Sequence, residues 1–278
     1  MVSIGTTWDR TVDFVRSHLG TVMPVVIITQ FLPGVVSGSL EGLGQDGATG
    51  TRIALGILTL AVSIVSLWGG LFITALAALE APRASGAIAR DIATRRFLPL
   101  VGVSILLLLI VAVAMLPGVL IAMGSGFDFA GIAAGAEPAP EQFAALGPAA
   151  LYFVLVGPFL LWLFARLLPV TAVVALERRG AGAIPRAFAL TRGMALKLIG
   201  VLILYAIVAG VAMMAVSAVF GAVFALFSDA ESPVSIGAVV IAIAISAVSA
   251  ALALFQSAFI GKLYRGIVGE EDKAAVFE

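Results

Sequence analysis

The chain has 278 residues, of which 62% are hydrophobic and 12% charged, and its mean hydropathy is +1.17. A soluble domain of this length covers its surface with charged side chains, and this composition excludes such a surface. The chain has no cysteine, which excludes disulfide bonds and thiolate metal sites, and its single histidine is His18. Its net charge is zero and therefore does not indicate a nucleic acid partner.

Long apolar intervals follow one another along the chain, and each can hold one membrane crossing. A helix needs about 20 apolar residues to cross a hydrocarbon core of roughly 30 Å. Runs this long, without alternation, predict helices and not barrel strands. The predicted spans are 19–40, 53–79, 97–127, 142–165 with its continuation to 176, 198–228 and 232–261. We therefore expect an all-α polytopic membrane protein with six transmembrane helices in a single membrane domain, 1–278.

The basic residues predict the orientation of these spans. If the N-terminus, the loops 81–97 and 177–197 and the cytoplasmic tail 263–278, with Lys262 directly before it, share one side, every Lys and Arg except Arg52 and Arg166 belongs to that side. Because basic loops stay in the cytoplasm, we expect both termini there, an N-in/C-in protein. The abundance of Ala, Gly, Val and Arg suggests the inner membrane of a bacterium.

An internal repeat precedes the spans that run outward. Residues 86–96 match 182–192 at an offset of 96, and 6–16 match 86–96 more weakly at an offset of 80. The shared arginines are Arg10 and Arg16, Arg90 and Arg96, and Arg186 and Arg192. The shared apolar pairs are Trp8 and Val12, Ile88 and Ile92, and Ile184 and Phe188. We expect three parallel repeats, 3–79, 83–176 and 180–262, each an amphipathic helix followed by a helical hairpin, around a pseudo-threefold axis.

The repeated arginines have two interpretations. Near an anionic membrane surface each is worth on the order of 1 kcal/mol, so Arg90, Arg96, Arg186 and Arg192 are candidate contacts for anionic lipid. Alternatively they only enforce the topology. Small-residue stripes, such as Ser66, Gly70, Thr74 and Ala78 and then Ala242, Ser246 and Ala250, predict packing faces between helices.

Arg166 lies inside the predicted fourth span, eleven residues before Glu177. In an upright helix that is roughly 16 Å deep, where an arginine costs about 2.5–3.5 kcal/mol without a partner. Its candidate partners include backbone carbonyls, among them that of Ala165, which loses its helical hydrogen-bond donor at Pro169. The others are a lipid phosphate, water, and the side chains of Gln30, Gln256 and Tyr205. Arg166 is either a structural residue or a site for an anionic headgroup or solute.

Two glutamates end the second and fourth spans at equivalent places in the repeat. We expect Glu80 and Glu177 to form structural ion pairs with the arginines of the neighbouring amphipathic helices. The sixth span has Lys262 near the corresponding point.

The sequence lacks the patterns of an enzyme. A single histidine excludes HExxH, and neither GxSxG nor a Walker loop is present. Partial matches at Asp46-Gly47 and at Gly124–Asp128 lack their partner aspartates. We expect no catalytic residues, no metal and no cofactor.

Residues 166–193 resemble a known family. Arg166, Pro169, Glu177, Gly180 and the run Arg186–Gly193 are similar to the membrane domain of some glycerophosphodiester phosphodiesterases. The resemblance implies a six-span architecture in the inner membrane. It does not imply the phosphodiesterase activity, which in that family belongs to a separate soluble barrel that these residues do not contain.

We therefore expect a non-enzymatic integral membrane protein that acts as a scaffold or accessory subunit. Its partners would be membrane lipids, anionic ones among them, or another membrane protein, and its oligomeric state stays open. A small channel or transporter with a cavity along the pseudo-threefold axis is the alternative.

Overall fold

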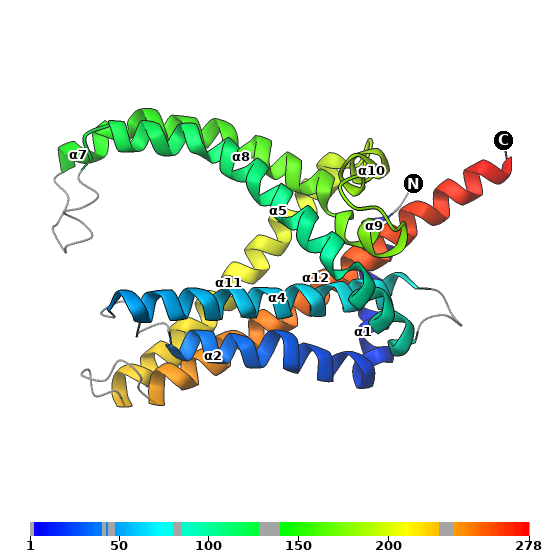
Figure 1. The fold of residues 1–278 in the computed structure, drawn as a ribbon, viewed down its shortest axis with the longest axis horizontal. Coiled ribbons are helices and arrows are strands. Elements are labelled where there is room, and N and C mark those ends of the chain that lie inside the picture. The colour runs from blue at the N-terminus through cyan, green and yellow to red at the C-terminus, as the bar shows by residue number, and fades with distance from the viewer. Residues whose placement is uncertain are drawn as a thin grey trace.

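The computed structural model describes residues 3–40, 43, 48–79, 85–127, 140–227 and 236–277, without the side chains of 140–142, 223–227 and 270–277 (Figure 1). Throughout this part of the chain every regular element is a helix. The elements are α1 (Ile4–Val26), the π-helix η1 (Ile27–Phe31), α2 (Leu32–Leu40), α4 (Thr49–Ala78), α5 (Gly86–Gly124), α7 (Pro140–Ala145), α8 (Gly147–Leu167), α9 (Val170–Leu176), α10 (Ala183–Leu190), α11 (Ala195–Phe227) and α12 (Ile236–Phe277).

Six helical stretches are long and apolar enough to cross a membrane. They are Ile4–Leu40, Thr49–Ala78, Gly86–Gly124, Gly147–Leu176, Ala195–Ala222 and Ile236–Gly269. Each contains one predicted span or most of it. Large apolar side chains along them are exposed, including Leu98, Leu204 and Met214, as lipid-facing positions require. The all-helical class and the six candidate spans agree with the prediction.

Only one of the three predicted amphipathic helices is an element separate from the span that follows it. The third, α10, ends in a turn over 191–194 in which Gly193 has φ +77°, a conformation that glycine tolerates. The first and second are the opening turns of α1 and α5 and continue into the span without a break, so that part of the prediction was wrong. Neither α1 nor α5 has such a glycine at its junction. In Figure 1 the start of α1 nevertheless runs across the direction of α2.

The helix of the sixth span continues through most of the predicted tail. α12 runs without a break from Ile236 to Phe277, and the prediction that 263–278 lies in the cytoplasm stays a prediction. The start of α1 and the end of α12 lie at the same end of the molecule as α9 and α10 (Figure 1). We call this the basic end, after the arginines and lysines described below.

Five helices contact one another in a closed cycle, in the order α4, α5, α8, α11 and α12. The first span packs outside this cycle, on α12 and α4. The short helix α9 contacts α4, α5 and α12, and its Val170 and residues 172–175 are buried. Pro169 separates it from α8 because proline has no N–H for the helical hydrogen bond. The cycle is therefore filled by α9 at the basic end.

The predicted stripe on α4 is a packing face. A Cβ at Gly261 of α12 would lie 2.6 Å from the Thr74 carbonyl oxygen and 2.8 Å from the Ala77 Cβ. Thr74 Oγ1 donates a hydrogen bond to the Ser257 carbonyl at 3.1 Å. Backbone contact this close needs small residues on both helices, so the prediction for this stripe is confirmed.

The first span docks on α4 and α12 through similar contacts. Ser66 Oγ donates to the Thr29 carbonyl, and Gln30 Nε2 donates to the Ser66 carbonyl, both at 2.9 Å. A Cβ at Gly34 would lie 2.9 Å from the Ser246 Oγ, and one at Gly38 would lie 3.1 Å from the Ala242 Cβ. The small residues of α12 therefore form the packing face predicted for them.

Candidate functional site

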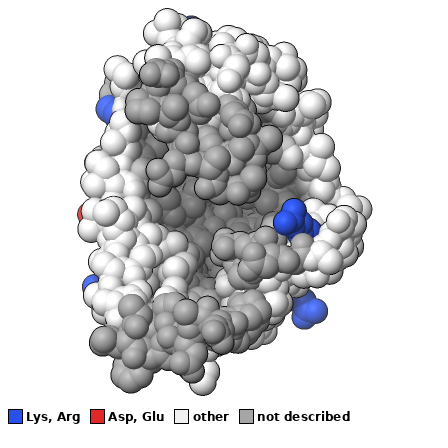
Figure 2. Space-filling model, turned by 90° about the vertical axis from the view of Figure 1, so that its left-hand side faces the viewer, with Lys and Arg blue, Asp and Glu red and all other residues white. Residues whose placement is uncertain are grey.

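Tertiary contacts bring the basic segments together at one end of the bundle. The Lys262 Nζ of α12 lies 4.7 Å from the centre of the Phe14 ring of α1. The start of α5 lies beside the first span, since a Cβ at Gly86 would be 2.8 Å from the Thr21 Cγ2. Figure 2 looks onto the opposite end, where few Lys or Arg side chains are visible.

Glu177 is the centre of an ion-pair cluster at the basic end. Arg186 Nε donates to its two carboxylate oxygens at 3.0 and 3.1 Å, and Arg179 Nε lies 3.2 Å from Oε2. Tyr264 Oη of α12 donates to Oε1 at 3.2 Å. The Glu177 side chain is 17% exposed, so the pair with Arg186 is shielded from water. The carboxylate holds the loop 177–182 and α10 against α12. Glu80 lies outside the described residues.

Arg166 binds a backbone carbonyl, one of the predicted kinds of partner, but the residue that supplies it was not predicted. Its Nη1 donates to the Thr191 carbonyl at 2.6 Å, while Thr191 Oγ1 donates back to the Arg166 carbonyl at 3.0 Å. The guanidinium carbon lies 5.2 Å from the Phe188 ring centre, a distance at which the ring attracts the cation. Nε is buried without a hydrogen-bond partner. Arg166 thus joins the end of α8 to the turn after α10.

The other predicted partners of Arg166 are engaged elsewhere. Gln30 binds Ser66, Tyr205 Oη donates to Gln256 Oε1 at 3.3 Å, and the Ala165 carbonyl accepts from the Leu168 N–H at 3.4 Å. The depth expected for Arg166 assumed a straight helix as far as Glu177. The break at Pro169 invalidates that assumption and brings the guanidinium to the loop 177–197.

The remaining predicted arginines do not join these clusters. Arg90 and Arg192 are exposed and Arg96 is half-buried. In the described part of the chain none of these three arginines forms a salt bridge, whereas Arg186 forms one with Glu177. Arg95, beside them, pairs with Asp91 at 2.8 Å in an exposed contact.

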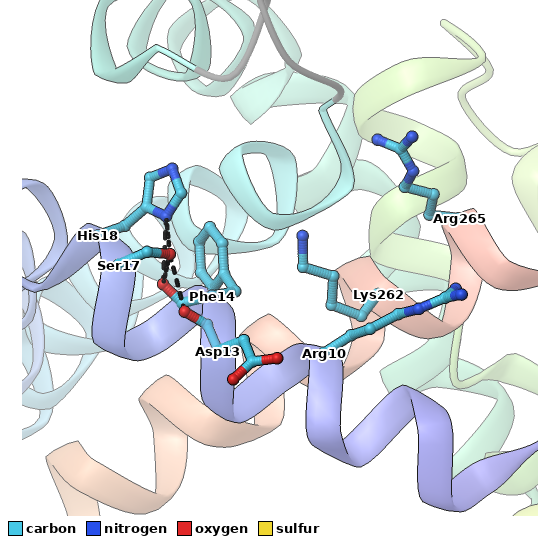
Figure 3. Close-up of a pocket in the computed structure, with 7 residues that line it drawn as sticks. All are labelled: Arg10, Asp13, Phe14, Ser17, His18, Lys262 and Arg265. Carbon is cyan, nitrogen blue, oxygen red and sulfur yellow. Dashed lines mark hydrogen bonds between the residues drawn. The ribbon is translucent and has the colours of Figure 1, made fainter.

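A basic pocket between α1 and α12 was missed by the sequence analysis (Figure 3). Its volume is about 530 Å³, and its lining residues are Arg10, Asp13, Phe14, Ser17, His18, Lys262 and Arg265. The signal available in the sequence was Lys262, which stands near the point where the other two predicted repeats have a glutamate. The pocket itself could not be predicted, because its two walls come from opposite ends of the chain.

The polar side chains of the pocket differ in their contacts with the rest of the protein. His18 Nδ1 lies 2.9 Å from Ser17 Oγ and 3.2 Å from the Phe14 carbonyl, so the histidine is tied to its own helix. Asp13 forms no salt bridge with any described residue, and Figure 3 shows its carboxylate turned away from the Lys262 ammonium. The pocket therefore presents an excess of positive charge.

No protein-family model, no curated protein and no solved structure matches this chain. The resemblance of residues 166–193 to the phosphodiesterase membrane domain stays a prediction.

Proposed function

We propose that the protein is a non-enzymatic integral protein of a bacterial inner membrane, a scaffold or accessory subunit that binds anionic lipid at its basic end. The observation that carries the proposal is the exposure of Arg90 and Arg192 there, without an internal counter-ion among the described residues. A headgroup phosphate supplies the missing negative charge. The basic end lies in the cytoplasm in this proposal, with both termini.

Arg166 has a structural part in the proposed function. Its guanidinium is engaged by the Thr191 carbonyl and the Phe188 ring, and its partner Thr191 is fully buried. A lipid phosphate at Arg166 would have to displace these contacts. Arg186 is likewise compensated by Glu177. The lipid contacts proposed here are therefore Arg90 and Arg192, with Arg96 beside them.

The test is lipid retention in nanodiscs made from equal parts of phosphatidylglycerol and phosphatidylcholine. We expect native mass spectrometry to find phosphatidylglycerol enriched on the wild-type protein. The double variant Arg90→Gln/Arg192→Gln should reduce this enrichment by roughly tenfold or more, since each arginine near an anionic surface is worth about 1 kcal/mol.

The control is Arg52→Gln, which removes one positive charge, half of the change in the double variant, from an exposed residue at the other end. It should leave the enrichment unchanged. Equal retention of the two lipids by the wild-type protein, or an equal loss in the control, would contradict the proposal.

A small channel or transporter is the second candidate, and the helix cycle favours it. The five helices of the cycle surround the region that α9 fills at the basic end. In this candidate α9 would be a plug, hinged at Pro169. Solute uptake into vesicles that requires the protein would favour this candidate over the scaffold.

A further inference from the structure

The starts of the first and third repeats bury the same positions. In α1 the buried residues are Thr7, Thr11, Phe14 and Val15. In α10 and the turn after it, the repeat alignment places Ala183, Ala187, Leu190 and Thr191 at these positions, and all four are buried. The corresponding residues of α5 are exposed, and Ala89 and Ala93 are buried instead. The first and third segments thus present matching faces, and Arg10 corresponds to Arg186.

The two corresponding arginines, Arg10 and Arg186, have neighbours of different charge. Arg186 meets the carboxylate of Glu177, which ends the preceding span. Arg10 instead lines a pocket with Lys262, which stands near the corresponding point of the sixth span, and with Arg265. A carboxylate thus faces the arginine in one repeat, and an ammonium lines the pocket with it in the other. The like charges of Arg10 and Lys262 repel each other, and a bound anion relieves that repulsion.

The pocket lies where a lipid headgroup can reach it. Trp8, which is half-exposed, stacks on Phe255 of α12 with ring centres 5.9 Å apart, two helical turns before Lys262. Exposed tryptophans favour the level of the headgroups. The Lys262 Nζ lies over the Phe14 ring and keeps its hydrogen atoms available to a ligand, because an aromatic face accepts none of them in a conventional hydrogen bond.

We propose that this pocket binds a phosphate group, with Arg10 and Lys262 as its contacts. A phosphate oxygen takes the place beside Arg10 that the Glu177 carboxylate occupies beside Arg186. Arginine binds two phosphate oxygens through its planar fork, and lysine contributes a point charge. The source is a lipid headgroup or a soluble phosphate. The inference rests on the proposed function only for the lipid source.

The pocket is tested with two probes on the purified full-length protein. The first is inorganic phosphate in neutral detergent, compared with chloride at equal ionic strength, and the measurement is the shift of the thermal unfolding midpoint. The second is phosphatidic acid in phosphatidylcholine nanodiscs, measured by native mass spectrometry. Phosphate stabilisation indicates a soluble source, and retention of phosphatidic acid alone indicates a headgroup.

Lys262→Glu is the decisive variant, because it gives the pocket an internal carboxylate like that of Glu177 beside Arg186. We expect it to unfold at the wild-type temperature or above while its affinity for the probe falls by at least about tenfold. Arg10→Gln, at an exposed position, should also weaken binding. Lys197→Glu makes the same charge change at an exposed residue of α11 and should bind as the wild type does.

Two results would overturn the inference. One is that neither probe binds the wild-type protein above its chloride or phosphatidylcholine control. The other is that Lys262→Glu and Arg10→Gln bind the probe as tightly as Lys197→Glu. The proposed surface binding fails independently, because its test depends on Arg90 and Arg192, which do not line the pocket.

Discussion

Replacing Gly261 with alanine is expected to destabilise the helix bundle by about 1–3 kcal/mol, the usual cost of inserting a methyl group into a packed interior. The new Cβ would lie 2.6 Å from the Thr74 carbonyl oxygen and 3.1 Å from the Ala78 nitrogen. Both are backbone atoms of a helix, so α4 and α12 must move apart. That separation also stretches the hydrogen bond from Thr74 to Ser257. Thermal unfolding in mild detergent, followed by the fluorescence of the three tryptophans, measures the effect.

The control for this prediction is Gly210→Ala in α11. A Cβ at Gly210 meets nothing within 4 Å, so alanine there should be neutral or stabilise by up to about 1 kcal/mol, as expected for a helix interior. Gly261→Ala should therefore lower the unfolding midpoint, whereas Gly210→Ala should leave it unchanged or raise it. If Gly261→Ala unfolds no earlier than the wild type, α4 and α12 are not packed as closely as described.

Replacing Glu177 with glutamine is expected to cost about 1.5–3 kcal/mol, the contribution of a hydrogen bond to a charged group. Glutamine keeps the shape of the side chain and removes the charge that Arg186 and Arg179 share. Because the Arg186 side chain is only 26% exposed, water compensates for the loss only in part. The same unfolding measurement applies.

Asp91→Asn is the matched control, since it also neutralises a carboxylate that pairs with an arginine. The Asp91 and Arg95 side chains are 57% and 74% exposed, and such pairs contribute only about 0.3–0.5 kcal/mol. A double-mutant cycle of Glu177→Gln with Tyr264→Phe should show non-additive costs, because the Tyr264 hydroxyl donates to the same carboxylate. Equal costs for Glu177→Gln and Asp91→Asn would contradict the proposed shielding.

The spans and packing stripes could be predicted because they depend on local sequence. Hydrophobic length decides which segments can cross a bilayer, and every described candidate span contains one predicted apolar run or most of it. The stripe that includes Thr74 was visible because residues four apart share a helix face. The ion pair between Glu177 and Arg186 was also within reach, because the two residues lie close together in the sequence.

Contacts between distant segments could not be predicted in this way. The partner of Arg166 depends on the break at Pro169 and on the turn that Gly193 permits, which together bring Thr191 to the end of α8. The pocket of Arg10 and Lys262 requires α1 to pack on the end of α12. Neither arrangement follows from hydropathy, and the amphipathic pattern does not show whether a short helix separates from its span, as α10 does, or continues into it.

Site-specific cysteine labelling tests most directly whether the six helices thread a membrane with the basic end in the cytosol. The chain has no cysteine, so Ala87→Cys at the start of α5 and Ala48→Cys before α4 each create a single, exposed reporter. In intact spheroplasts a membrane-impermeant maleimide should label the cysteine at position 48, and the one at position 87 should react only after lysis. Labelling of both positions in intact cells, or of position 87 alone, would contradict the account.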